Sequence, residues 1–85
     1  MEQFSDWERR SLAGLPGVGL ALVSRLEQIG ICTFNQLAGA EVDDVLLQIS
    51  SLPGASCWRG SQQARIEVML AVAQARHSTA MAVSR

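Results

Sequence analysis

The tripeptide Leu-Pro-Gly occurs twice in this chain of 85 residues, at positions 15–17 and 52–54. Proline fixes its own φ and glycine accepts a positive φ, so each copy predicts a tight turn between two helices. The first copy continues as Val18-Gly19, which places a second glycine where the next helix begins. Such a turn can point backbone N–H groups outward at a helix amino end, an arrangement that suits anions.

Apolar residues around these turns recur every three or four positions, which is the period of an amphipathic helix. The pattern predicts helices over about residues 5–13, 20–29, 34–38, 41–51 and 62–77. Three of them begin at hydroxyl residues that favour helix capping, namely Ser5, Thr33 and Ser61. No segment requires a strand, so the chain is predicted to be all-α, with about five short helices.

The last predicted helix carries two apolar stripes. One contains Ile66, Met69, Leu70 and Ala73, and the other contains Ala64, Val68, Val72 and Ala75. Either this helix is central to the fold, or the Val68–Val72 stripe pairs with another chain. Trp7, packed with Phe4, and Trp58 in the second loop are expected to fill the core.

Composition narrows the functional classes. All seven basic residues are arginine and the net charge is −1, which excludes lysine Schiff-base chemistry and disfavours tight binding to nucleic acid. Residues 57–85 nevertheless carry four arginines against one acid, enough for a small basic face. The longest apolar run, residues 68–73, is too short to cross a bilayer, and we expect a soluble, cytoplasmic protein.

The sequence contains no recognisable catalytic or metal-binding set. Cys32, Cys57 and His77 have a spacing that matches no zinc motif, and both thiols are expected to be buried and inert. The carboxylates within residues 41–44 fit the favourable first turn of a helix. We therefore predict a non-enzyme without metal or cofactor.

The glycine pattern from Leu15 through Gly30 to Leu37 resembles the helix-hairpin-helix motif. It is most similar to small bacterial domains in the C-terminal part of competence regulators of the TfoX type and in pathogenicity locus proteins. The similarity covers about residues 9–50, and residues 57–76 fit a second, degenerate unit. The resemblance implies a SAM-like double helix-hairpin-helix domain with the following parts: domain 1–77, first unit 5–30, connector helix 33–39, second unit 41–77 and flexible tail 78–85.

In DNA-binding members of that family, hairpin amides contact phosphates without reading sequence. Carried over by position, these amides belong to Gly17, Val18 and Gly19. Such members usually place a Lys or Arg just after the second glycine, where this chain has Leu20 and Ala21. In the second hairpin, a serine replaces the second glycine.

Two hypotheses follow. In the first, the hairpin amides bind the backbone of double-stranded DNA weakly, with help from Arg25, Arg59 and Arg65. In the second, the chain keeps the fold as a protein-interaction or self-association module, using Leu20 or the Val68–Val72 stripe. The arginines also have a plainer interpretation as solvated side chains or as ion-pair partners of Asp44 and Glu67.

Overall fold

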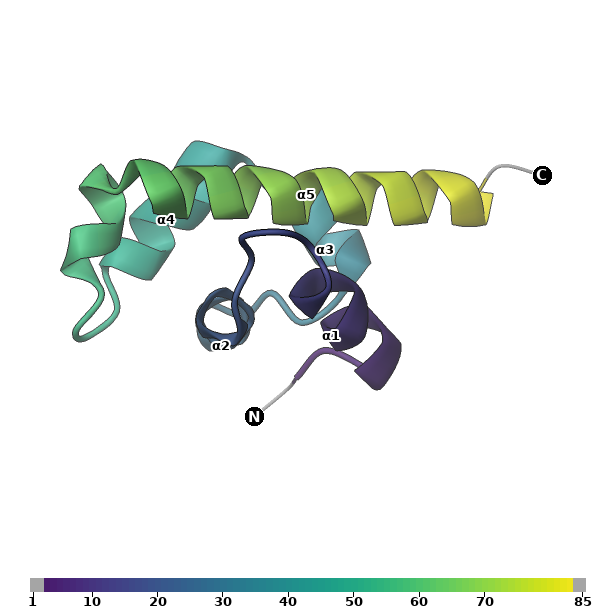
Figure 1. The fold of residues 1–85 in the computed structure, drawn as a ribbon, viewed down its shortest axis with the longest axis horizontal. Helices are drawn as coiled ribbons and strands as arrows, with labels where there is room; N and C mark the ends of the chain where they lie inside the picture. Colours follow the sequence, from purple (N-terminus) through teal and green to yellow (C-terminus); the bar gives the residue numbers. More distant parts are fainter. Residues whose placement is uncertain (1–2, 84–85) are drawn as a thin grey trace.

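A computed structural model describes residues 3–83, and this range contains five α-helices, one 3-10 helix and no strand. In chain order these are α1 (Asp6–Ala13), α2 (Leu20–Gln28), α3 (Phe34–Ala38), α4 (Val42–Ser50), the 3-10 helix η1 (Ser56–Gly60) and α5 (Gln62–Val83) (Figure 1). The all-α prediction is confirmed, and the first four helices match their expected bounds within one residue. Among the described residues, no helix combines the length and apolar character of a membrane span.

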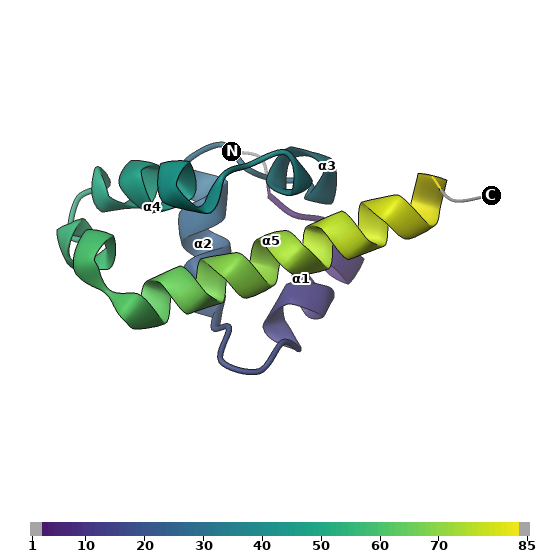
Figure 2. The same ribbon diagram turned by 90° about the horizontal axis from the view of Figure 1, so that it is seen from above.

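The longest helix, α5, forms the spine of the molecule. It has 22 residues, which span about 33 Å at 1.5 Å per residue. It runs along the 41 Å long axis, with α1, α2 and α3 below it and α4 passing behind it in this view (Figure 1). Seen from above, α3 and α4 follow one flank of α5, α1 lies on the other, and α2 crosses beneath (Figure 2). One helix therefore covers the core that the four shorter helices share.

The two Leu-Pro-Gly segments fold into the same turn. In the first, the N–H of Val18 donates to the carbonyl of Leu15 at 3.1 Å, and Gly17 has a φ of 81°. In the second, the N–H of Ala55 donates to the carbonyl of Leu52 at 3.1 Å, with φ 77° at the glycine. Proline followed by a glycine with positive φ is the pattern of a type II turn.

The residue after each Pro-Gly pair is buried, and the two turns differ from that point onward. Gly19 is the N-cap residue of α2, so α2 starts directly after the first turn. After the second turn, η1 intervenes before α5 begins at Gln62. The N–H of Trp58 donates to the carbonyl of Ala55 within this inserted segment. The two copies of Leu-Pro-Gly therefore form the same turn, but only the first copy is followed directly by an α-helix.

Buried apolar side chains from every α-helix form one core beneath α5. Its largest fully buried members are Leu12, Leu22, Leu26, Leu37, Ile49, Val45 and Val68. Arg76 ties α5 to the end of α3, because its guanidinium donates to the carbonyls of Ala38 and Ala40 at 3.0 and 3.3 Å.

The two stripes of α5 take opposite roles, and this corrects the prediction that the Val68–Val72 stripe forms a partner surface. Val68 and Val72 are 0% and 2% exposed and lie in the core. Ile66 and Met69, on the other stripe, are 48% and 52% exposed. The buried stripe is rich in alanine and valine, and such small side chains let a long helix approach its neighbours closely.

Two further sequence predictions also differ from the structure. Trp7 is 58% exposed rather than buried, and its ring packs edge-on against Phe34 with centroids 5.2 Å apart. The segment predicted to be a flexible tail from residue 78 is instead the continuation of α5 as far as Val83. Residues 84–85 of that segment lie outside the described residues. Trp58 is half-buried and packs against the core, as expected.

The buried carboxylate of Glu8 joins the starts of two helices. Its Oε1 accepts from the hydroxyl of Ser5 at 2.9 Å and from the Ser5 N–H at 3.3 Å, which completes a capping box on α1. Its Oε2 accepts from the N–H of Phe34 at 2.8 Å, at the start of α3. A charged acceptor here satisfies donors that would otherwise be buried without a partner.

We expect Glu8→Ala to lower the free energy of unfolding by about 2–3 kcal/mol, because the Phe34 N–H loses its charged acceptor inside the core. Asp6→Asn, in the same helical turn but exposed, should cost no more than about 0.5 kcal/mol. Urea denaturation followed by circular dichroism measures both variants. Equal losses would show that Glu8 acts only through the helix dipole.

We also expect Val68→Ala to cost about 2 kcal/mol through the methyl groups and cavity lost from the core. Ile66→Ala, two residues away on the exposed stripe, should change stability by less than about 0.5 kcal/mol. The same denaturation assay compares them. A larger loss of stability for Ile66→Ala than for Val68→Ala would mean that the stripe containing Ile66 faces the core.

Candidate functional site

The first hairpin, residues 15–19, leads into α2 and presents a row of free backbone donors. Within the described residues, the N–H groups of Gly17, Gly19, Leu20 and Ala21 have no hydrogen-bond acceptor. They stand at the amino end of a nine-residue helix, where the aligned peptide dipoles favour negative charge. This geometry suits an anion approaching along the axis of α2.

Val18 does not belong to this set of donors, which corrects the prediction that its amide points outward between the two glycines. Its N–H is used inside the turn, and its side chain is buried in the core. The amides of Leu20 and Ala21 are donors that sequence reasoning missed. They follow from the N-cap position of Gly19, because the first N–H groups of any helix lack partners within it.

The two glycines of the first hairpin have different roles. The positive φ of Gly17 is strained for any residue with a side chain, so glycine is required there by the turn. Gly19 has a φ of −104°, which every residue tolerates. A Cβ added at Gly19 would lie 3.9 Å from the amide nitrogen of Ala21. Glycine at this position therefore leaves the amino end of α2 uncovered.

The start of α5 lies close to the first hairpin. The side-chain Nε2 of Gln63 is 3.9 Å from the position of a Cβ on Gly17, and both views show the two segments on the same side of the molecule (Figures 1 and 2). Ser61 caps α5 as predicted, with its Oγ accepting from the N–H of Ala64 at 3.1 Å. Gln63 thus lies at the start of α5 next to the turn of the first hairpin.

Two of the three predicted arginines lie at this second helix start. Arg59 and Arg65 line a hollow of about 170 Å³ whose remaining walls are Gly60, Ser61 and Gln62. We call it the amino-end hollow. Arg25 is not part of this group. Its guanidinium donates to the side chain of Gln28 at 3.3 Å, in the last turn of α2.

Arg65 forms an ion pair that the sequence did not identify. Its Nη1 lies 2.7 Å from Oδ1 of Asp43, at the start of α4, rather than beside Asp44 or Glu67. Both partners are exposed, with side-chain exposures of 47% and 78%. Behind them, on the side of α4, lies a second hollow of about 300 Å³ lined by Asp43, Asp44, Leu46, Leu47, Arg59 and Arg65. We call it the α4 hollow.

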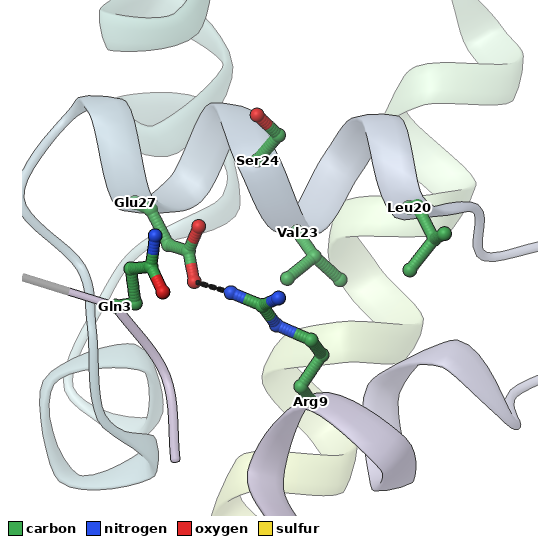
Figure 3. A pocket seen from close by; sticks show the side chains of 6 residues that line it. All are labelled: Gln3, Arg9, Leu20, Val23, Ser24 and Glu27. Atoms are coloured by element: carbon green, nitrogen blue, oxygen red, sulfur yellow. Dashed lines mark hydrogen bonds and ion pairs between the residues drawn. The ribbon is translucent and has the colours of Figure 1, made fainter. Parts of the chain in front are cut away.

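Leu20 is 66% exposed and stands at the edge of a third hollow, between α1 and α2 (Figure 3). This hollow has a volume of about 300 Å³, and its lining residues are Gln3, Arg9, Leu20, Val23, Ser24 and Glu27. Across it, Nη2 of Arg9 pairs with Oε2 of Glu27 at 2.9 Å. The predicted exposure of Leu20, on one face with Ser24 and Glu27, agrees with this arrangement.

Groups capable of catalysis are scattered. In the described part of the chain, no three His, Cys, Asp or Glu side chains are placed to hold a metal ion. Cys32 is buried as expected, but Cys57 is exposed, because η1 carries it on the outside of the second hairpin. His77 is exposed on α5.

In the comparisons with known proteins, no protein-family model, curated protein or solved structure matches this chain. The functional assignment therefore rests on the chemistry of the two helix starts and on the hairpin motif in the sequence.

Proposed function

We propose that this chain is a small, non-catalytic helix-hairpin-helix module that binds the phosphate backbone of double-stranded DNA weakly and without sequence preference. The observation that carries the proposal is the set of free amides at the first hairpin, on Gly17, Gly19, Leu20 and Ala21. Amides and helix dipoles of this kind bind phosphate oxygens. The resemblance of the motif to DNA-binding hairpins supports the same interpretation.

The start of α5 adds the charge that the first hairpin lacks. Arg59 and Arg65 lie beside its amino end, and Gln63 connects this region to Gly17. A guanidinium donates two parallel hydrogen bonds to phosphate oxygens. A DNA strand that reaches from the hairpin amides to the start of α5 would meet these arginines.

Affinity is expected to be low because few cations take part. Each arginine that neutralises a phosphate contributes about −0.9 to the slope of log K against log salt. With Arg59 and Arg65 as the only such groups, the slope should lie between about −1 and −2. The proposal assigns both arginines to phosphates, and contacts with phosphates carry no direct sequence information.

The experiment that tests this function is a fluorescence-anisotropy titration of labelled DNA duplexes of several sequences with the full chain. We expect similar affinities for all duplexes and a decrease of about three- to tenfold between 50 and 150 mM salt. Absence of binding at 50 mM would contradict the proposal. Strong preference for one sequence would contradict the backbone mode.

Gly19→Ser separates binding from folding. Serine is a good N-cap residue, so its hydroxyl should accept from the α2 amides and leave stability unchanged or raise it by up to about 1 kcal/mol. The same hydroxyl and its Cβ occupy the place of the phosphate, so DNA affinity should fall about three- to tenfold. Anisotropy and urea denaturation measure the two effects. An unchanged affinity would mean that the amides of α2 are not the binding site.

A protein partner is the second candidate function, and the exposure of Leu20 beside the hollow between α1 and α2 favours it. Leu20→Lys distinguishes the two candidates. A cation next to the hairpin should raise DNA affinity about two- to fivefold if phosphate is the ligand. Titration of the same duplexes measures this change, and a decrease would favour a role for Leu20 in an apolar contact.

A further inference from the structure

Arg65 is the one residue besides Arg59 that lines both the amino-end hollow and the α4 hollow. The two hollows differ in charge. The amino-end hollow offers the dipole of α5 and the backbone of Gly60 and Gln62, whereas the α4 hollow contains two carboxylates, those of Asp43 and Asp44. The 2.7 Å contact with Asp43 directs the guanidinium of Arg65 toward the α4 hollow.

This contact competes directly with a phosphate. An ion pair between exposed side chains is weak, so a phosphate can displace it. While the pair persists, the carboxylate of Asp43 uses a donor that the phosphate needs and repels the approaching anion. Arg59 differs from Arg65 here, because no acidic partner holds it among the described residues.

We infer that Asp43 limits the affinity of the proposed DNA-binding site, by holding Arg65 in an ion pair that phosphate must break. This inference rests on the proposed function. In the resting protein the hairpin amides and Arg59 are available, and Arg65 is withheld. Binding moves the guanidinium of Arg65 from Asp43 to the phosphate and leaves the carboxylate to solvent.

The test is Asp43→Asn, which removes the charge with little change in shape, measured by anisotropy with labelled DNA duplexes. We expect affinity at 50 mM salt to rise about two- to fivefold, because Arg65 no longer has to leave the carboxylate of Asp43 to reach the phosphate. Glu41→Gln is the matched control. It removes the same charge at the N-cap of α4, where the Glu41 side chain makes no capping hydrogen bond, and should change affinity less than twofold.

A second comparison isolates the role of Arg65. In an Arg65→Gln background, Asp43→Asn should have no more effect than Glu41→Gln, because the competed donor is already absent. Circular dichroism of each variant verifies the helical fold.

The outcomes separate the inference from the proposed function. If the unmodified chain binds and Gly19→Ser weakens it, but Asp43→Asn matches Glu41→Gln, the inference is wrong and the function stands. A loss of affinity in Asp43→Asn also overturns the inference, since Asp43 would then position Arg65 for phosphate. If neither the unmodified chain nor Asp43→Asn binds at 50 mM, the proposed function fails and the inference fails with it.

Discussion

The carboxylate of Glu8 holds the amino ends of α1 and α3 together at the edge of the core. Burying a carboxylate costs desolvation energy, and here hydrogen bonds from Ser5 and Phe34 offset that cost. Both helix dipoles also favour a negative charge at this point. Because the contact fixes the backbone of Phe34, its ring is held beneath Trp7 and beside Phe4. The short helix α3 is thereby held in place where it packs against α5.

The two hairpins carry different chemical groups. At the first, Gly19 starts a helix at once, so backbone donors remain open. At the second, the inserted η1 uses backbone donors internally and brings Arg59 ahead of α5. Neutral amides therefore gather at one hairpin and guanidinium groups at the other.

Much of the local structure could be predicted from sequence because its causes are local. The Pro-Gly turns depend on two adjacent residues, and Thr33 caps α3 through the N–H of Gln36 within a single turn. The side chain of Gln36 also accepts from the N–H of Cys32 at 2.7 Å, within the same helix start.

Contacts between distant segments could not be predicted in this way. Both stripes of α5 are apolar, so periodicity alone could not say which of Ile66 and Val68 faces the core. The deciding factor is the space between α5 and its neighbours, which alanine and valine fit and larger side chains do not. Glu8 looked like an ordinary first-turn acid, because its partner Phe34 is 26 residues away. The ion pair of Asp43 with Arg65 is non-local for the same reason.

The net charge of −1 is a weaker guide to phosphate binding than the local set of donors. At about 0.1 M salt, charges more than roughly 10 Å away are largely screened, whereas a bound phosphate touches its donors directly. The free amides of the first hairpin have no acceptor in the described structure, but the carboxylate of Glu67 lies nearby, because it accepts from the Gln63 side chain that stands next to Gly17. The arginines contribute less than their full charge to phosphate binding, because Arg65 forms an ion pair with Asp43. In the proposed function, this chain therefore binds phosphate chiefly through its backbone amides. The arginines add a smaller part of the affinity, and that part decreases as salt is added.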